Sequence, residues 1–358
     1  MEDDSPYAWS LSKHLPPAGT RPNLTDIVAA EARNLGTVVH TPLVSLPGWD
    51  DGAGGTTEVL GKMESLQPIG SYKLRGTCNN IKALLEVEGE RLQKEGVTTS
   101  SSGNWACGVA FMCAKFGLKC TICVPDNAPP AKLERVREIY PAVNIVPLPW
   151  EKYWNVVLTR QYPPGAEQIH PSPVVDHATM AGNGTLGLEI LREVPDCDAI
   201  LCPYGGGALS TGIAIAAKAL KPEIKVFACE VETAAPFSAA LANGAPKDID
   251  NSGRAFIDGI GNSGLMTEIW PISRDVLDGT LIVTVAEAAE ACRRMAVESK
   301  LVIEGASGCG VAAARKYGPQ HRWKKAVCVV TGGNIDPGVF TEIIHGGVPT
   351  STTSKSKM

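Results

Sequence analysis

The sequence predicts an α/β protein with two open parallel-sheet domains and flanking helices. Two observations indicate this class: apolar, strand-like runs alternate with helix-like stretches, and glycine-rich segments lie at wide spacing among them. The chain has 358 residues, of which 44% are hydrophobic. That length and composition are enough to form about two domains with a sizeable core.

The alternation forms two series, as is typical of parallel sheets covered by helices. The first series comprises strands at 97–100 and 119–124 and helices at 105–116 and 130–139. The second comprises strands at 199–203, 226–230 and 326–330 and helices at 186–193, 210–220 and 286–299. Between them, residues 143–180 are rich in Pro, Trp and Tyr with weak periodicity, so we expect a crossing between domains that carries some irregular structure.

Composition excludes several classes of protein. The net charge is −5, without a Lys/Arg stripe, so we expect no nucleic-acid partner. Eleven cysteines, an odd number set mostly in apolar runs, indicate a reduced intracellular chain. Cys120 and Cys123 would lie on opposite faces of a strand, so we expect no metal site there.

The ends of the chain bear on location. The first 25 residues lack the basic start and apolar stretch of a secretory signal, and no segment is long enough to span a membrane. We therefore expect a cytoplasmic protein with no membrane partner. The ending Ser356-Lys357-Met358 is close to the peroxisomal Ser-Lys-Leu signal, which leaves the peroxisome as an alternative.

Three segments pair small residues with hydrogen-bond donors, as backbone cradles for phosphate require. They are Ser101-Ser102-Gly103-Asn104, Gly205-Gly206-Gly207-Ala208 and Thr331-Gly332-Gly333-Asn334. The second lies between a predicted strand and a predicted helix, where amides and helix dipole both face an anion. It has neither a Gly-Lys-Ser/Thr ending nor a spaced Gly-x-Gly-x-x-Gly, which argues against nucleoside triphosphates and dinucleotides.

Taken in order, these motifs resemble the pyridoxal-phosphate enzymes of the tryptophan synthase beta-like fold (fold type II), within the serine racemase and threonine/serine dehydratase group. The likeness runs from about Thr41 to about Ile344. It includes Ser-Tyr-Lys-Leu-Arg-Gly at 71–76, Asp-Gly at 258–259 and Ile-Glu-Gly-Ala at 303–306, besides the three glycine segments. The resemblance implies a large cofactor-binding domain of residues 1–75 plus 176–345, a small substrate-gating domain of residues 76–175 and a disordered tail at 346–358.

The resemblance also implies roles for individual residues around pyridoxal 5'-phosphate. Lys73 would form the Schiff base with the cofactor aldehyde and then move the substrate α proton, as a partly desolvated lysine can do near neutral pH. The cofactor would be held by Tyr72 beside the ring, Asn104 on the ring hydroxyl, Gly205, Gly206, Gly207 and Ala208 around the phosphate, Glu304 nearby and Thr331 facing the pyridine nitrogen. A neutral hydroxyl at Thr331 does not force that nitrogen to be protonated, which favours β-elimination.

The substrate-binding residues implied are Ser101, Ser102, Gly103, Asn104 and Trp105. Ser102 would lie on the ring face opposite the lysine, where it could exchange a proton. Trp105 stands where relatives carry His, which puts substrate identity in doubt. Serine racemases bind a divalent ion in the segment matching 230–236, but Pro236 occupies the second carboxylate position, so we expect no strong metal site.

The expected activity is a lyase, threonine/serine dehydratase-like, that converts a small β-hydroxy amino acid such as L-threonine or L-serine into a 2-oxo acid and ammonia. Three alternatives stay open: racemisation through Lys73 and Ser102, β-replacement as in cysteine synthases, and a non-enzymatic binding protein. By analogy with relatives, we expect a homodimer that takes a small amino-acid substrate.

Overall fold

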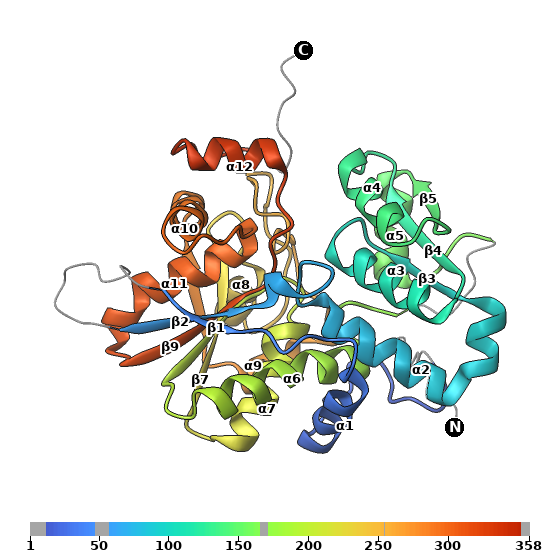
Figure 1. Ribbon diagram of the computed structural model, residues 1–358, viewed down its shortest axis with the longest axis horizontal. Helices are drawn as coiled ribbons and strands as arrows, with labels where there is room; N and C mark the ends of the chain where they lie inside the picture. The colour runs from blue at the N-terminus through green and yellow to red at the C-terminus, as the bar shows by residue number, and fades with distance from the viewer. Residues whose placement is uncertain (1–11, 47–56, 165–170, 254, 352–358) are drawn as a thin grey trace, which may run out of the picture. The chain divides into compact units, whose positions relative to one another are not determined.

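The computed structural model describes residues 12–46, 57–164, 171–253 and 255–351, and it divides into two compact units (Figure 1). Unit 1 comprises residues 1–38 and 73–182, and unit 2 comprises residues 39–72 and 183–358. The sequence placed residues 1–75 in the large domain. Among the described residues, 12–38 group with 73–182, and helix α1 (Leu24–Asn34) packs on α2 (Lys73–Glu95). The large cofactor-binding and small substrate-gating domains, with their limits, stay a prediction.

Unit 1 is built on a small parallel sheet in the order β3-β4-β5. Its central strand is buried at every residue, as a strand covered on both faces must be. The strands are β3 (Val97–Ser100), β4 (Cys120–Pro125) and β5 (Asn144–Leu148). The helices are α1, α2, α3 (Asn104–Phe116), α4 (Pro130–Ile139) and α5 (Trp150–Thr159). Helix α6 (His177–Glu193) begins in this unit and ends in unit 2.

Unit 2 contains a six-stranded sheet in the order β1-β2-β9-β6-β7-β8, in which only β1 is antiparallel to its neighbour. The strands are β1 (Leu43–Ser45), β2 (Glu58–Met63), β6 (Ala199–Pro203), β7 (Lys225–Val231), β8 (Thr280–Val283) and β9 (Lys325–Val330). Because β6 and β9 are parallel neighbours, the loops that follow them leave from the same edge of the sheet.

Helices cover both faces of this sheet, with α10 (Val285–Val297) and α11 (Gly305–His321) on one side and α7 (Ala208–Leu220) and α9 (Trp270–Val276) on the other (Figure 1). The remaining elements of unit 2 are the short helix η1 (Glu64–Leu66), α8 (Pro236–Asn243) and α12 (Pro337–Ile344). A buried apolar cluster from β6, β7, β9, α10 and α11 forms the core. The α/β class with parallel sheets is thus confirmed.

Most predicted elements are confirmed, and one region is not. Strands 97–100 and 199–203 and helix 130–139 have the predicted bounds. The region 143–180, expected to carry irregular structure, contains β5, α5 and the start of α6. Pro147 interrupts the β5 pattern, which an edge strand tolerates. In α5, Trp150 and Trp154 stack on the exposed side, whereas Tyr153 packs against the buried cluster of Cys123, Leu148 and Val156.

Asp176, just before α6, lies buried in unit 1 and should make stability depend on pH. It accepts hydrogen bonds from the Ser172 amide at 2.6 Å and from Asn80 Nδ2 at 3.0 Å. Burial outweighs these bonds and the Arg160 charge, and raises the pKa of Asp176 from 3.8 to about 6.

A carboxyl whose pKa is higher in the folded state stabilises the fold below pH 3.8 and loses that contribution as the pH rises through about 6. Asp176→Asn should therefore flatten the change in unfolding free energy across this window, removing up to about one proton from the unfolding equilibrium. Thermal unfolding of both proteins between these pH values measures the effect. Identical pH profiles would contradict the assignment.

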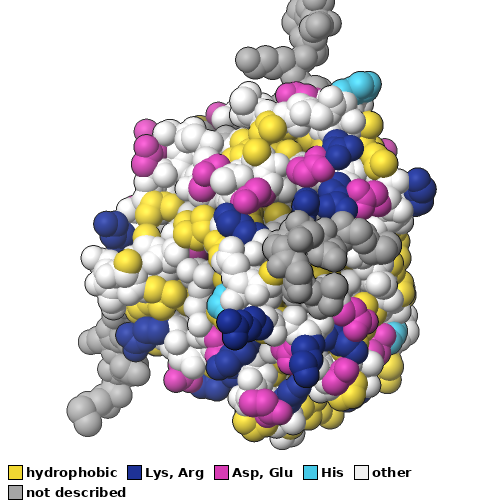
Figure 2. Space-filling view, turned by 90° about the vertical axis from the view of Figure 1, so that its left-hand side faces the viewer, with side chains coloured by type: hydrophobic (Ala, Val, Ile, Leu, Met, Phe, Trp, Pro, Cys, Tyr) yellow, Lys and Arg dark blue, Asp and Glu magenta, His cyan; other side chains and the backbone are white. Residues whose placement is uncertain are grey.

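The distribution of surface charges and the state of the cysteines bear on the expectations from composition. Figure 2 shows Lys and Arg interspersed with Asp and Glu on one face of the molecule, without a patch of one sign there. All eleven cysteines are free and buried. Within the described residues, no helix is both long and apolar enough to cross a bilayer. The predicted tail beyond residue 351 and its Ser356-Lys357-Met358 ending lie outside the described residues.

Candidate active site

The glycine segment 205–208 forms the turn between β6 and α7 in unit 2. Helix α7 begins at Ala208, two residues earlier than the sequence indicated, and Gly207 is its N-cap with φ +92°. No side chain caps this helix, so the amides of its first turn are available to an anion. An uncapped helix start after a parallel strand is the arrangement that a phosphate group needs.

Two of these glycines also leave no room for a side chain. A Cβ on Gly207 would lie 2.6 Å from the Tyr204 hydroxyl, and one on Gly205 would lie 2.8 Å from the Gly259 carbonyl oxygen. Tyr204 is held in place because its hydroxyl donates to Ser273 Oγ at 3.1 Å. Burial raises the pKa of Tyr204 above its usual range, so this phenol stays neutral. Tyr204 and Gly259 therefore restrict the conformation of the glycine turn 205–208.

The third glycine segment follows β9 and gathers several predicted site residues in unit 2. The Tyr72 amide donates to the Thr331 carbonyl oxygen at 2.9 Å, and Ser71 pairs with Gly332 in an isolated antiparallel bridge. A Cβ on Gly332 would lie 2.7 Å from the Glu304 carboxylate. Burial, Cys202 and the Glu304 charge together raise the pKa of Tyr72 above its usual range. Unit 2 thus brings Tyr72, Glu304 and Thr331 together.

Lys73 directly follows Tyr72 and is the first residue of α2. The division between the units falls at this peptide bond. The backbone hydrogen bond between Tyr72 and Thr331 fixes the residue before Lys73, so the Lys73 backbone lies one residue from Thr331's hydrogen-bond partner.

The serine-glycine segment 101–104 lies in unit 1 at the turn from β3 to α3. Its Ser101 amide donates to the Cys123 carbonyl oxygen at 3.1 Å, and its Gly103 amide donates to Ser101 Oγ at 3.2 Å. Gly103 is the N-cap of α3, and no side chain caps this helix either. A helix start without a side-chain cap is suited to a carboxylate.

Trp105, proposed from the sequence as a substrate contact, is only 2% exposed. Its indole N–H donates to Thr99 Oγ1 at 2.9 Å, and that hydroxyl donates to the Pro171 carbonyl oxygen at 3.2 Å. The ring therefore supports the β3–α3 turn from the interior of unit 1. Its contact with substrate stays a prediction, as do the other assigned roles.

Comparison with known proteins agrees with this arrangement. The family model described as "Pyridoxal-phosphate dependent enzyme" matches residues 35–332. The chain belongs to this family. It is 34% identical over 326 residues to the L-threonine ammonia-lyase of Thermotoga maritima, covering 91% of this chain and 79% of that protein. It is 31% identical over 335 residues to a serine racemase of Oryza sativa subsp. indica, covering 91% and 95%.

A solved structure shares the fold as well. Maize serine racemase superposes with a TM-score of 0.80 at 29% sequence identity, over 91% of this chain and 98% of that one. The fold is therefore that of the fold type II enzymes, and the cofactor of the family is pyridoxal phosphate.

The residues present fit this cofactor. The glycine turn before α7 offers uncapped amides to a phosphate, and added side chains would collide with Tyr204 and Gly259. The Ser71 hydroxyl, in the turn before Tyr72 and Lys73, is fully buried and has no hydrogen-bond partner among the described residues. An unsatisfied buried hydroxyl in this turn is expected where a polar ligand completes the site.

Glu230 is the first residue of the segment compared with the metal site of serine racemases, and in this structure its carboxylate accepts hydrogen bonds from the start of a helix. Both of its carboxylate oxygens accept backbone hydrogen bonds, from the Phe237 amide at 2.8 Å and the Ser238 amide at 2.9 Å. They cap α8, which begins at Pro236. A cation there would have to compete with these two bonds, and hard cations need several oxygen ligands.

We therefore expect millimolar Ca²⁺ or Mg²⁺ to change the melting temperature by less than about 1 °C, because a ligand stabilises a fold only when it binds the folded state. Thermal unfolding with each ion and with excess chelator tests this expectation. Stabilisation at micromolar ion would show that a metal site exists.

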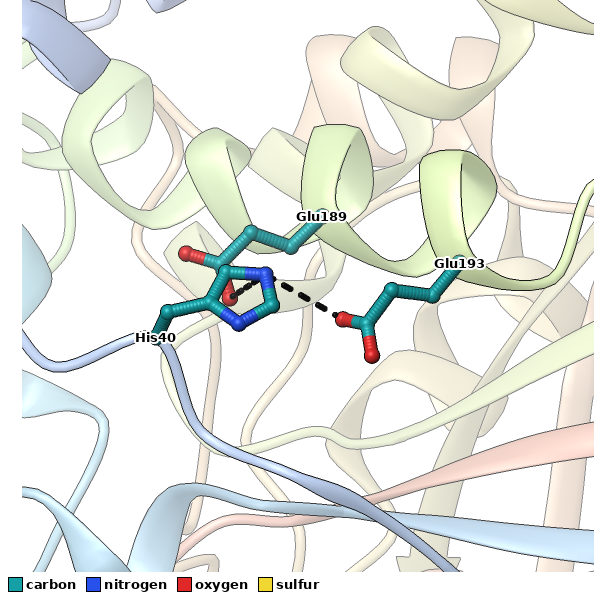
Figure 3. A group of neighbouring side chains, drawn as sticks. All are labelled: His40, Glu189 and Glu193. Atoms are coloured by element: carbon teal, nitrogen blue, oxygen red, sulfur yellow. Dashed lines mark ion pairs between the residues drawn. The ribbon is translucent and has the colours of Figure 1, made fainter.

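One further group contains side chains of metal-binding type: His40, Glu189 and Glu193 (Figure 3). His40 Nε2 lies 3.3 Å from Glu193 Oε1 and 3.9 Å from Glu189 Oε2. The same carboxylates hold the fully buried Lys62 ammonium, at 2.6 Å and 3.1 Å. Lys62 also donates to the Thr41 carbonyl oxygen at 2.7 Å. Because the buried Lys62 ammonium already pairs with both carboxylates, the group forms an ion-pair network.

Ser307 is a residue that the sequence analysis missed. It lies in the first turn of α11, one residue beyond the motif 303–306, and its Oγ is 3.0 Å from Thr331 Oγ1. The available signal was its position directly after the motif 303–306.

Proposed function

We propose that this protein is a pyridoxal-phosphate-dependent ammonia-lyase that converts L-threonine or L-serine into a 2-oxo acid and ammonia. The observation that supports it best is the similarity to L-threonine ammonia-lyase across 91% of this chain, together with an intact Lys73 and phosphate turn. Lys73 would hold the cofactor, Gly205 to Ala208 its phosphate, Tyr72 its ring and Thr331 its pyridine nitrogen.

When bound, the cofactor supplies an electron sink for the substrate α carbon. The amides at the start of α3 would orient the substrate carboxylate. The Lys73 amine would take the α proton, and loss of the β-hydroxyl as water would then leave a product that water hydrolyses to a 2-oxo acid and ammonia. The neutral hydroxyl of Thr331 favours this elimination, because the ring nitrogen need not be protonated.

Release of 2-oxo acid and ammonia from a panel of L- and D-β-hydroxy amino acids tests the proposal with purified, cofactor-loaded protein. We expect equimolar release of both products from L-threonine, L-serine or both. No release from any member of the panel, with the lysine-linked cofactor visible by its absorbance, would contradict the lyase.

Racemisation is a second candidate activity, supported by the similarity to rice serine racemase. Ser102 lies at the β3–α3 turn beside the amides proposed for the carboxylate, and its hydroxyl would exchange a proton on the ring face opposite Lys73. Chiral analysis of recovered substrate measures this activity. Ser102→Ala should abolish racemisation while elimination continues, whereas equal loss of both activities would indicate a general role for Ser102.

We also propose a homodimer in the cytoplasm or peroxisome, without a nucleic-acid partner. The net charge of −5 and the mixed charges in Figure 2 support the last point. Sedimentation equilibrium measures the assembly, and a monomer at micromolar concentration would contradict the dimer.

A further inference from the structure

A chain of buried hydrogen bonds leads from the serine-glycine turn 101–104 into the interior of unit 1. It starts at Trp105, the second residue of α3, and continues through Thr99, which is 1% exposed. The indole N–H donates to Thr99 Oγ1 at 2.9 Å, and Thr99 Oγ1 donates to the Pro171 carbonyl oxygen at 3.2 Å. This hydrogen-bond relay of Trp105, Thr99 and Pro171 ties the turn to a segment 72 residues from Thr99 along the chain.

The number of hydrogens fixes the direction of both bonds. An indole nitrogen only donates, a carbonyl oxygen only accepts, and a hydroxyl has one hydrogen. Because the Trp105 N–H occupies a lone pair of Thr99 Oγ1, the single Thr99 hydrogen is directed to the Pro171 carbonyl oxygen. Without the indole N–H, the hydroxyl would lose the partner that joins it to α3.

The far end of the relay is anchored on another helix. The Ser172 amide donates to Asp176 at 2.6 Å, and the Ser172 carbonyl oxygen accepts from Thr179 Oγ1 at 2.9 Å. Asn80 Nδ2 donates to Asp176 at 3.0 Å and to Thr179 Oγ1 at 2.9 Å. Asn80 lies in α2, the helix that begins at Lys73. The segment that accepts the last hydrogen bond of the relay is therefore held by that helix.

We propose that Trp105 is a positioning residue, which through Thr99 and the Pro171 carbonyl holds the turn 101–104 in the geometry that binds the substrate carboxylate. The inference rests on the proposed function, in which the amides at the start of α3 bind that carboxylate. No side chain caps α3, so the indole N–H is a side-chain hydrogen bond that restrains its first turn. The proposal goes further than the assigned contacts, because this residue sets substrate affinity through other residues.

Trp105→Phe keeps an aromatic ring and removes the N–H. We expect KM for L-threonine or L-serine to rise about five- to ten-fold at unchanged kcat, as the free energy of one hydrogen bond implies for an interaction that binds ground and transition states equally. The dissociation constant of L-alanine, which lacks a β leaving group, should rise by the same factor when followed by the absorbance of the bound cofactor. A purely structural role would lower the melting temperature and leave both constants unchanged.

Variants of Thr99 separate the relay from packing of the ring. Thr99→Val has a similar shape without the hydroxyl and should raise both constants at least as much as Trp105→Phe. The double variant should equal Thr99→Val, because both substitutions break the same relay. Thr99→Ser retains the hydroxyl and should keep the wild-type values. Tyr140→Phe is the matched control in unit 1, since it removes a hydroxyl that donates to the Leu118 carbonyl oxygen at 3.0 Å, and should leave both constants unchanged.

Unchanged constants in both Trp105→Phe and Thr99→Val would overturn the relay and retain the proposed function. A rise in only one of the two variants would also overturn it, because the two side chains would then act separately. If either variant does not fold, Thr99→Cys decides in its place, since a thiol is a weak donor and acceptor of similar size. Failure of the wild-type protein to bind pyridoxal phosphate would refute the proposed function itself.

Discussion

Lys73→Ala is expected to lower turnover by at least about 10⁴-fold, since one substitution removes both the covalent attachment of the cofactor and the base for the α proton. The variant should also lose the visible absorbance of the lysine-linked cofactor. Steady-state release of 2-oxo acid and an absorbance spectrum of the loaded protein measure the two effects. A variant that retains both would refute the assignment of Lys73.

Lys94→Ala is the matched control, because Lys94 is an exposed lysine in the last turn of the same helix. We expect it to keep both turnover and absorbance. Equal melting temperatures of the two variants in the absence of cofactor would show that the loss in Lys73→Ala is chemical and not a loss of folding.

Gly207→Ala should weaken cofactor binding by about 10- to 100-fold. The added methyl group would lie 2.6 Å from the Tyr204 hydroxyl and 2.9 Å from its ring carbon, and φ of +92° disfavours any residue other than glycine. The loop has to move, and its amides then no longer converge on the phosphate. Titration of the apo protein with pyridoxal phosphate, followed by absorbance, gives the dissociation constant.

Gly244→Ala controls for the backbone strain alone. Gly244 has φ of +76° and ends α8, but a Cβ there would meet no atom within 4 Å. We expect a stability loss of about 1 kcal/mol and unchanged cofactor affinity. If both variants bind the cofactor as wild type does, the turn at 205–208 is not the phosphate site.

Local pattern was sufficient for much of the fold. The strand at 199–203 and the helix after the glycine turn were predictable, because a continuous apolar run, small turn residues and an alanine-rich stretch each point to one conformation. The start of α7 at Ala208 instead of Ser210 reflects the conformation of Gly207, which composition alone does not reveal.

Contacts between different elements explain what the sequence could not provide. Glu230 caps a helix seven residues away through two backbone amides, and Ser307 bonds to a residue 24 positions along the chain. The burial of Trp105 depends on Thr99 in the neighbouring strand. Each of these contacts joins a strand or the loop after it to the start of a helix, so composition and periodicity along one element do not reveal it.

The attachment of the cofactor to Lys73 can be measured by reduction with borohydride, which fixes pyridoxal phosphate to the lysine that holds it, followed by peptide mapping with mass spectrometry. We expect one modified peptide, with the added mass on Lys73 in the segment Ser71-Tyr72-Lys73-Leu74-Arg75. Modification of a different lysine, or none in a protein saturated with pyridoxal phosphate, would contradict both the site and the mechanism built on it.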